Sequence, residues 1–191
     1  VLSHGLHYGS CVFEGERVYN GNIFKLREHT ERLITSAKTL GFEIPYSLED
    51  IETATLETVE AQGYDDAYVR PVAWRGSEMM GVSAQQSTIH LAIAVWEWPS
   101  YFSPEARMQG IKLKWAPYKR PSPECAPVHS KAAGLYMICT LSKHAAEADG
   151  FDDALMLDWR GQIAETTGAN VFLVIDDVIH TPTPDCFLNG I

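Results

Sequence analysis

The sequence has little that points to a membrane, a nucleic acid or a disulfide framework. None of its apolar runs reaches the roughly 18 residues of a membrane-spanning helix, so no membrane partner is expected. Its 25 aspartates and glutamates outnumber 15 lysines and arginines, which argues against a nucleic-acid surface, because such a surface needs a basic patch. The four cysteines form no C-x-x-C pair, and this favours reduced thiols in a cytoplasmic protein over a disulfide framework or a zinc site.

Internal repeats and low-complexity segments are also missing. The first residues contain neither a methionine start nor the pattern of a signal peptide. With 191 residues, of which 46% are hydrophobic and 21% are charged, the chain is long enough for one large domain or two small ones. We therefore expect an ordinary globular protein.

The first forty residues predict a hairpin followed by a helix. Asn20-Gly21 is a strong two-residue hairpin signal between a strand within residues 10–19 and a return strand over 22–24. Apolar residues then recur at helical spacing over residues 26–40, and Gly41 is a natural C-terminal stop.

A second helix is expected to begin at Ser47, with Asp50 as its capping partner, and to end near Gly63. Residues 68–74 form a predicted strand in which Pro71 suggests an edge or a bulge. The remaining expectations are a buried strand over 89–96, turn formers over 99–104, a strand over 111–115, irregular structure over 117–127, a helix over 135–148, and strands over 154–157, 171–175 and 178–180, the last two joined at Asp176-Asp177. Strand clusters around a few helices predict an α+β (mixed α/β) fold rather than regular βαβ alternation.

Lys131 is the first candidate for chemistry. It lies among small residues between the proline-rich segment and a predicted helix. A nucleophilic lysine needs an amine that is partly neutral, and small neighbours leave room for a flat cofactor. A surface lysine just ahead of a helix fits the same residues, and on the residues alone it is the more common case.

Glu165 and Arg32 have two interpretations each. Glu165 lies between two strand-like segments, where a carboxylate held near a pyridine nitrogen would keep that nitrogen protonated and make the ring an electron sink. The same residue fits a glutamate in a polar turn. Arg32, beside the apolar stripe of the first helix, fits either a phosphate ligand or a surface arginine with a packed stem. A metal-dependent hydrolase with His4, His7 and Glu14 as metal ligands is a further alternative. The residues favour it little, because no strong third ligand follows the two histidines.

Several blocks together resemble bacterial branched-chain amino-acid aminotransferases, which are class IV, or fold-type IV, pyridoxal-phosphate enzymes. The similar blocks, in register along the whole chain, are residues 4–17, 27–33, 67–71, 80–82, 130–136 and 164–172. This resemblance implies a small N-terminal α/β domain over residues 1–104, lacking its first strand, and the first part of a larger, pseudo-barrel cofactor-binding domain over residues 105–191.

The activity implied by the resemblance is transamination of leucine, isoleucine and valine with 2-oxoglutarate, giving branched 2-oxo acids and glutamate. Within the same fold, a D-amino-acid aminotransferase, an (R)-amine aminotransferase and an aminodeoxychorismate lyase are alternatives. A non-catalytic binding protein on this scaffold, or an inactive fragment, is an alternative of another class.

The cofactor implied by the resemblance is pyridoxal 5'-phosphate, bound covalently by the catalytic Lys131. The implied cofactor-binding residues are Arg32, Lys131, Tyr136, Glu165, Thr166, Thr167, Asn170 and Ile191. Among these, Arg32 would bind the phosphate, Tyr136 the phenolic oxygen and Glu165 the ring nitrogen. Ile191 would begin a phosphate-binding loop, and the remaining side chains would contribute weaker contacts.

The implied substrate-binding residues are Tyr8, Phe13, Gly15, Arg17, Tyr68, Arg70, Trp98 and Tyr101. Aromatic residues suit branched aliphatic side chains, although Trp98 and Tyr101 fit core packing equally well. Arg70 and Arg17 are the cations available for the distal carboxylate of glutamate. In this family the loop of Tyr8 reaches a neighbouring subunit, which implies a homodimer or a dimer-based oligomer.

The sequence departs from the family pattern in two blocks. Residues 166–169 are poorer in glycine than the enterobacterial-type members, and residues 74–80 lack the usual acidic and glycine pattern. The resemblance therefore indicates the reaction type more closely than the substrate range. The chain also starts inside the first block and stops at Ile191, where the family continues, so the resemblance predicts a piece of a longer protein.

Overall fold

The computed structural model describes residues 1–98 and 104–191, which form two compact units. Unit 1 comprises residues 1–99, 130–134 and 191, and unit 2 comprises residues 100–129 and 135–190. Residues 130–134 thus belong to unit 1 although both of their sequence neighbours belong to unit 2. The domain boundary at residue 104 stays a prediction, because most of the turn-former segment lies outside the described residues.

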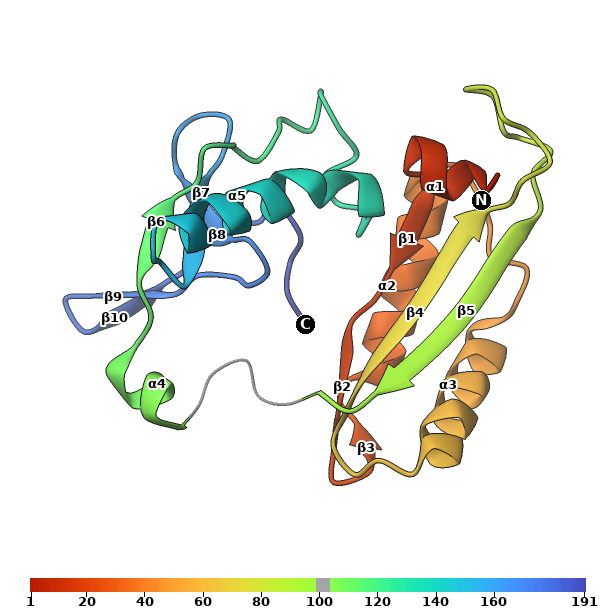
Figure 1. The fold of residues 1–191 in the computed structure, drawn as a ribbon, viewed down its shortest axis with the longest axis horizontal. Coiled ribbons are helices and arrows are strands. Elements are labelled where there is room, and N and C mark those ends of the chain that lie inside the picture. Colours follow the sequence, from red (N-terminus) through yellow and green to blue (C-terminus); the bar gives the residue numbers. More distant parts are fainter. Residues whose placement is uncertain (99–103) are drawn as a thin grey trace. The chain divides into compact units, whose positions relative to one another are not determined.

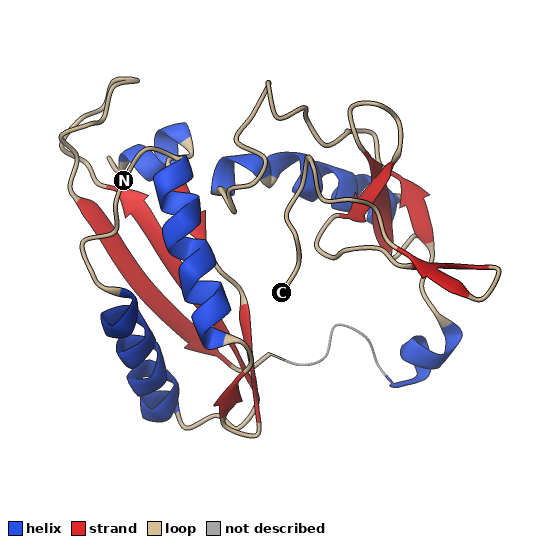
Figure 2. Cartoon of the chain, turned by 180° about the vertical axis from the view of Figure 1, so that it is seen from behind, coloured by secondary structure: helices blue, strands red, loops and turns tan. Residues whose placement is uncertain are grey.

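Unit 1 is built on a five-stranded sheet with two helices on one face (Figures 1 and 2). Its strands are β1 (Cys11–Phe13), β2 (Glu16–Tyr19), β3 (Asn22–Ile23), β4 (Ala67–Arg75) and β5 (Ile89–Trp96). The order is β1-β4-β2-β3, with β5 on β4, and every pairing is antiparallel. The long strand β4 therefore lies in the middle of the sheet.

The helices of unit 1 are α1 (His4–Tyr8), α2 (Leu26–Thr39) and α3 (Leu48–Gln62). The predicted capping box of α3 is confirmed: the Asp50 amide donates to Ser47 Oγ at 3.1 Å, and the Ser47 amide donates to Asp50 Oδ2 at 3.0 Å. The predicted stop of α2 is also confirmed, since Gly41 has the left-handed φ of 73°. The sequence analysis missed α1.

The core of unit 1 lies on one face of the sheet, the face that packs against α2 and α3. The buried clusters are Val12, Leu33, Ala37, Phe42 and Ala73, and Val18, Val59, Ala67 and Val69. Along β4 the odd-numbered residues from 67 to 73 are buried against α2 and α3, while the even-numbered ones are only partly buried. Because side chains alternate along a strand, Tyr68 and Arg70 lie on the face opposite the helices.

Two predictions for this sheet are wrong. Pro71 does not mark an edge strand, because β4 has neighbours on both sides. The proline lies opposite the break at residues 14–15 between β1 and β2, where the Glu14 amide donates to Pro71 O at 2.9 Å, so its missing N–H faces no continuous strand. The apolar strand β5 is not fully buried, because it pairs only with β4 and its side chains alternate between partly buried and exposed.

Unit 2 contains a three-stranded sheet, a hairpin and a long helix. The elements are α4 (Pro104–Gln109), β6 (Leu113–Trp115), α5 (Met137–Ala148), β7 (Asp153–Leu157), β8 (Ile163–Thr166), β9 (Leu173–Ile175) and β10 (Val178–His180), and a short 3-10 turn (Ala133–Leu135) precedes α5. The sheet order is β6-β7-β8, with β6 parallel and β8 antiparallel to β7. The separate ribbon β9–β10 turns at Asp176-Asp177, as predicted.

The predicted helix over 135–148 is confirmed as α5, but its buried face consists of small side chains rather than of its large apolar ones. Cys139, Ser142 and Ala146 are buried, whereas Leu141 is 47% exposed. These small side chains let α5 approach β7 closely, which decides the face more than hydrophobic spacing does.

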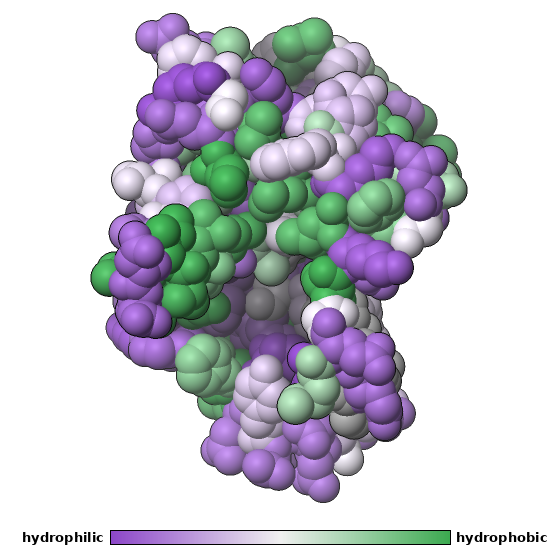
Figure 3. All heavy atoms as spheres, turned by 90° about the vertical axis from the view of Figure 1, so that its left-hand side faces the viewer, coloured by the Kyte–Doolittle hydropathy of each residue, from purple (hydrophilic) through white to green (hydrophobic). Residues whose placement is uncertain are grey.

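Exposed apolar side chains gather on the face of the molecule shown in Figure 3. Within unit 2, exposed examples on or beside the ribbon β9–β10 are Phe172, Val174, Ile175, Val178 and Ile179. No helix within the described residues is both long and apolar enough to cross a membrane.

Candidate active site

The segment that carries Lys131 is tied to the sheet and to α2. The Lys131 amide donates to Ser36 Oγ at 3.0 Å, and Ser130 Oγ donates to Ser36 O at 3.0 Å. The Phe13 amide donates to Lys131 O at 3.1 Å. Ser36 and Ser130 are both buried, so the backbone on either side of the lysine is held in the interior while its side chain remains partly exposed.

Beside this segment lies a buried ionic group formed by Glu14, His29 and Arg32. Arg32 Nε and Nη2 donate to the two carboxylate oxygens of Glu14 at 2.6 and 2.9 Å, and His29 Nδ1 lies 2.7 Å from Oε2. Burial alone raises the pKa of Glu14, but the hydrogen bonds from Arg32 and His29, together with the charges of Arg32 and Lys131, lower it overall. Glu14 is therefore a carboxylate, and Lys131 is near enough to favour its charge.

The role of Glu14 escaped the sequence analysis, which weighed it only as a metal ligand. The structure pairs it with Arg32 instead. His4, the proposed metal ligand, has both ring nitrogens beside other groups, Nδ1 at 2.6 Å from Ser10 Oγ and Nε2 at 3.0 Å from Gly81 O. The available signal for Glu14 was its place two residues after the buried Val12, directly after a strand whose alternate residues are buried.

The face of the unit 1 sheet opposite the helices, here called the aromatic face, brings most predicted substrate residues together. It carries Phe13, Arg17, Tyr68, Arg70, Trp96 and Trp98. Arg70 Nη2 donates to Tyr68 Oη at 2.8 Å, and the Arg70 guanidinium lies 4.5 Å from the centroid of the Phe13 ring. Lys131 Nζ lies 5.1 Å from the same centroid, so the lysine joins this face.

Gly15 leaves space for the Tyr68 side chain. A Cβ built at Gly15 would lie 2.0 Å from Tyr68 Oη, so any larger residue must displace the ring that Arg70 binds. On the same face, the buried Nε atoms of Arg17 and Arg70 find no hydrogen-bond acceptor among the described residues. Two buried guanidinium donors without acceptors suit a carboxylate-bearing ligand.

Tyr8 is not brought to this face. Its hydroxyl donates to Met80 O at 3.0 Å, and its ring stacks on His4 with centroids 4.5 Å apart. Nearly half of Tyr8 is exposed. The predicted pocket residue Tyr101 lies outside the described residues.

In unit 2, Glu165 lies on strand β8, so the interpretation as a turn glutamate is wrong. It stands opposite Met156 of β7 and forms an ion pair with Arg120, whose Nε is 3.2 Å from Glu165 Oε1. Arg120 is 4% exposed. The sequence analysis missed Arg120, because an arginine in a proline-rich segment gives no signal of burial.

The other unit 2 candidates are held mainly by their own loop. Thr166 Oγ1 donates to Ala169 O at 3.1 Å, and Thr167 Oγ1 donates to Asp153 Oδ1 at 2.5 Å. Asn170 Nδ2 donates to Leu188 O at 3.2 Å, which fastens the last residues to this loop. Tyr136 immediately precedes α5, and Ile191, which belongs to unit 1, is 44% exposed.

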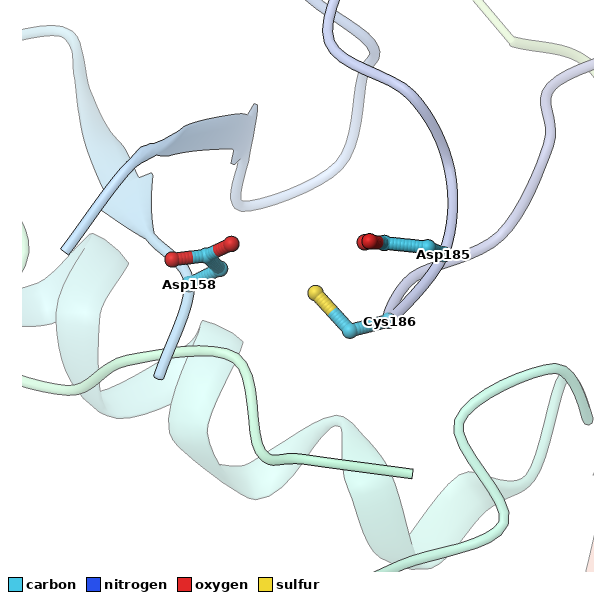
Figure 4. Close-up of side chains that lie close together, drawn as sticks. All are labelled: Asp158, Asp185 and Cys186. Atoms are coloured by element: carbon cyan, nitrogen blue, oxygen red, sulfur yellow. The ribbon is translucent and has the colours of Figure 1, made fainter. Parts of the chain in front are cut away.

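One cluster in unit 2 has metal-ligating side chains, namely Asp158, Asp185 and Cys186 (Figure 4). Their ligand atoms lie within 4.8 Å of one another. Arg160 already bridges the two carboxylates, with Nη2 at 2.6 Å from Asp158 Oδ2 and 2.9 Å from Asp185 Oδ2. The arginine supplies the positive charge there, and the cluster is an ion-pair network.

Comparison with known proteins places these features in a family. Residues 11–191 match the model of the amino-transferase class IV family. The chain is 45% identical, over all 191 residues, to a probable branched-chain-amino-acid aminotransferase of Rickettsia felis and covers 64% of that protein. It is 40% identical to the branched-chain-amino-acid aminotransferase of Pseudomonas aeruginosa, again covering 64%. The chain thus spans less than two thirds of these relatives.

Solved structures agree. The whole chain superimposes on 64% of a branched-chain amino acid aminotransferase solved with pyridoxamine 5'-phosphate, with a TM-score of 0.96 and 40% identity. It also superimposes on 63% of the Escherichia coli branched-chain amino acid aminotransferase, with a TM-score of 0.91 and 33% identity. The predicted α+β fold of the fold-type IV enzymes is confirmed, and the chain belongs to the class IV aminotransferase family.

Proposed function

We propose that the protein of which this chain is part transfers the amino group of branched-chain L-amino acids to 2-oxoglutarate, using pyridoxal 5'-phosphate. The relatives named above are branched-chain aminotransferases, and one was solved with pyridoxamine 5'-phosphate. The observation that carries the proposal is the position of Lys131, fixed by backbone bonds, next to both the Glu14–Arg32 pair and the aromatic face.

The residues present fit the cofactor. Lys131 offers a primary amine for an aldehyde, Arg32 offers a cation for the phosphate, and Glu165 offers a carboxylate for the ring nitrogen. The Arg32 side chain is 18% exposed, so its guanidinium reaches the surface of unit 1, and its ion pair with the fully buried Glu14 keeps it in place. When bound, the cofactor supplies the electron sink that makes the α-hydrogen of an amino acid acidic.

Within this scheme Lys131 would move the proton. With the cofactor bound, the Lys131 Nζ would act as the base that takes the proton from the substrate α-carbon and as the acid that returns it. The bonds of Ser36 and Phe13 to the Lys131 backbone confine this amine to one region of the aromatic face. A fixed base of this kind gains rate from orientation as well as from basicity.

The aromatic face suits both halves of the reaction. Rings of Phe13, Tyr68 and Trp98 provide apolar area for a branched side chain. The distal carboxylate of glutamate needs a cation, and Arg70 is our candidate, because its Nε has no acceptor among the described residues and its Nη2 is already oriented by Tyr68. The aromatic face thus offers an apolar lining together with cationic side chains.

We further propose a cytoplasmic homodimer or dimer-based oligomer that takes an amino acid and a 2-oxo acid as substrates. Support for the compartment comes from the thiols, since all four cysteines are free. Support for the dimer is the exposed Tyr8 on α1, which has no place on the aromatic face of its own chain.

The test uses the protein as its gene encodes it, mixed with pyridoxal phosphate. Bound cofactor should give a visible absorbance band that L-leucine bleaches and 2-oxoglutarate restores. Lys131→Ala should bind no cofactor covalently, while the matched control Lys119→Ala, at an exposed site, should behave as wild type. A wild-type protein that stays colourless contradicts the cofactor assignment, and bleaching by D-leucine instead of L-leucine contradicts the substrate assignment.

Arg70→Leu tests the cation assigned to glutamate. We expect the KM for glutamate to rise about 100-fold and the KM for leucine to change by less than about threefold, because only glutamate carries a distal carboxylate. Arg27→Leu, at an exposed position on α2, is the matched control. Equal effects of Arg70→Leu on both substrates contradict the assignment.

A further inference from the structure

Arg120 is fixed at the end of strand β7 by its backbone. Its amide donates to Leu157 O at 2.8 Å, and it forms a parallel bridge with Asp158. This bridge lies beyond β6, on the side of β7 away from β8. The position of the Arg120 side chain therefore follows from the sheet rather than from a surface loop.

The Arg120 side chain meets Glu165 across β7. Glu165 stands opposite Met156 on the β8 side of that strand, and the Arg120 Nε lies 3.2 Å from Glu165 Oε1. The Nε atom itself has no hydrogen-bond acceptor in suitable geometry among the described residues, and the two side chains form an ion pair. Arg120 Nη1 also donates to Cys139 Sγ at 3.5 Å, so helix α5 closes over the guanidinium.

A buried arginine has a specific electrostatic effect. Its guanidinium keeps its proton even when it is removed from water, unlike a lysine ammonium. A cation this close to a carboxylate favours the charged form of the carboxylate. The side chain of Arg120 is 5% exposed and that of Glu165 is 14% exposed, so water screens this interaction little.

We infer that Arg120 is a positioning residue that keeps Glu165 ionised and aimed, and thereby keeps the ring nitrogen of the cofactor protonated. When a carboxylate and a pyridine nitrogen share one proton, a second cation on the carboxylate moves the proton onto the nitrogen. The electron sink then has its full strength. This inference rests on the proposed function.

The test follows the ring nitrogen directly by NMR, in the complete protein loaded with cofactor labelled at that atom. The chemical shift reports whether the nitrogen carries a proton. Arg120→Gln retains a donor but removes the charge, and Arg120→Lys retains a charge that burial can remove. Lys119→Gln, at the exposed neighbouring position, is the matched control.

We expect wild type and Lys119→Gln to keep the nitrogen protonated throughout the neutral range, and Arg120→Gln to lose that proton. Turnover of Arg120→Gln should fall roughly 10- to 100-fold, as for outer partners of catalytic ligands, with less change in KM. An Arg120→Gln protein that binds cofactor and keeps a protonated nitrogen over the same pH range overturns the inference.

If Arg120→Gln does not fold, Arg120→Lys decides. A proton lost from the ring nitrogen at least about one pH unit earlier than in wild type supports the inference, because a buried lysine loses its charge as the pH rises. A titration identical to wild type overturns it. A wild-type protein that binds no cofactor would instead refute the proposed function, so the two failures are distinguishable.

Discussion

Among the described residues, each unit contains a buried arginine–glutamate pair. The two pairs differ in which partner, the arginine or the glutamate, is the more deeply buried. In unit 1 the arginine is the more exposed partner, with Arg32 at 18% and Glu14 at 0%. In unit 2 the carboxylate is the more exposed partner, with Glu165 at 14% and Arg120 at 5%. Unit 1 thus presents a cation backed by an anion, and unit 2 presents an anion backed by a cation.

This difference shows how the same two residue types serve opposite charges. A phosphate needs a cation and a protonated pyridine nitrogen needs an anion. Burying either charge alone would be strongly unfavourable, so each outward-facing group requires a hidden partner. The hidden partners, Glu14 and Arg120, should therefore matter as much for folding and ligand binding as the visible ones.

Removing the hidden partner in unit 1 should have the largest combined effect, on stability and on cofactor binding. Glu14→Ala leaves Arg32 and His29 without their carboxylate, and we expect a loss of about 3 kcal/mol in the free energy of unfolding, together with weaker cofactor binding. Urea unfolding and a cofactor titration measure both effects. The control is Glu31→Ala, an exposed glutamate of α2. A loss no greater than that of the control would show that the pair is dispensable.

The second effect concerns Glu16, a buried carboxylate with no hydrogen-bond partner among the described residues. Burial and the nearby charge of Glu14 raise the pKa of Glu16 from 4.5 to about 8. Between these two pKa values the folded protein holds a proton that the unfolded chain releases. The contribution of Glu16 to the free energy of unfolding is therefore complete below about pH 4.5 and is lost as the pH rises through about 8.

Glu16→Gln removes this dependence. Between about pH 5 and pH 9 the wild type should lose about 4 kcal/mol of unfolding free energy that the variant retains, since each pKa unit of difference between the folded and unfolded states corresponds to about 1.4 kcal/mol. Thermal unfolding across the range measures the difference. Parallel pH curves for the two proteins would show that Glu16 ionises as an ordinary carboxyl group.

Gly15→Ala probes the aromatic face of unit 1 alone. The new methyl group must displace the Tyr68 hydroxyl, which releases Arg70, so we expect KM values to rise about tenfold with a loss of about 1 to 2 kcal/mol in stability. Gly81→Ala, at an exposed position where a Cβ would meet nothing within 4 Å, is the control for stability. Unchanged kinetics would place the substrate away from Tyr68.

The smallest expected effect concerns the residue types at two hairpin turns, one in each unit. Unit 1 uses Asn20-Gly21, whereas unit 2 uses Asp176-Asp177, where both residues have positive φ angles of 51° and 61°. Asp177→Gly removes a strained Cβ, so we expect a gain of about 0.5 to 1 kcal/mol. Chemical unfolding measures it, and Asp152→Gly, outside the turn, should give no gain. An unchanged or lower stability of Asp177→Gly contradicts the account.

Local signals predicted the elements well. The capping box at Ser47, the stop at Gly41 and both hairpins were found because each depends on a few neighbouring residues. The neighbours of each strand in the sheet were harder to predict. The assignment of Pro71 to an edge failed because the gap opposite it, at residues 14–15, is formed by another part of the chain.

The predicted site divides in the same way. Residue types with a family pattern, such as Lys131 and Arg70, were found from sequence, and the structure places them on or beside one face of unit 1. Glu14 and Arg120 were missed as ion-pair partners because they act through contacts over long sequence separations, 18 residues to Arg32 and 45 to Glu165. Such pairs leave no periodic or motif signal.

Helix α2 carries both Arg32 and Ser36, and through them it sets how far Arg32, the proposed phosphate ligand, lies from the backbone of Lys131. These residues are four positions apart, about one helical turn. Inserting or deleting a single residue between them would rotate everything beyond by about 100° and separate the two contacts. Length changes over evolutionary time should therefore be absent from this turn and better tolerated in the connection that follows, at residues 43–46, between the core residue Phe42 and the cap Ser47.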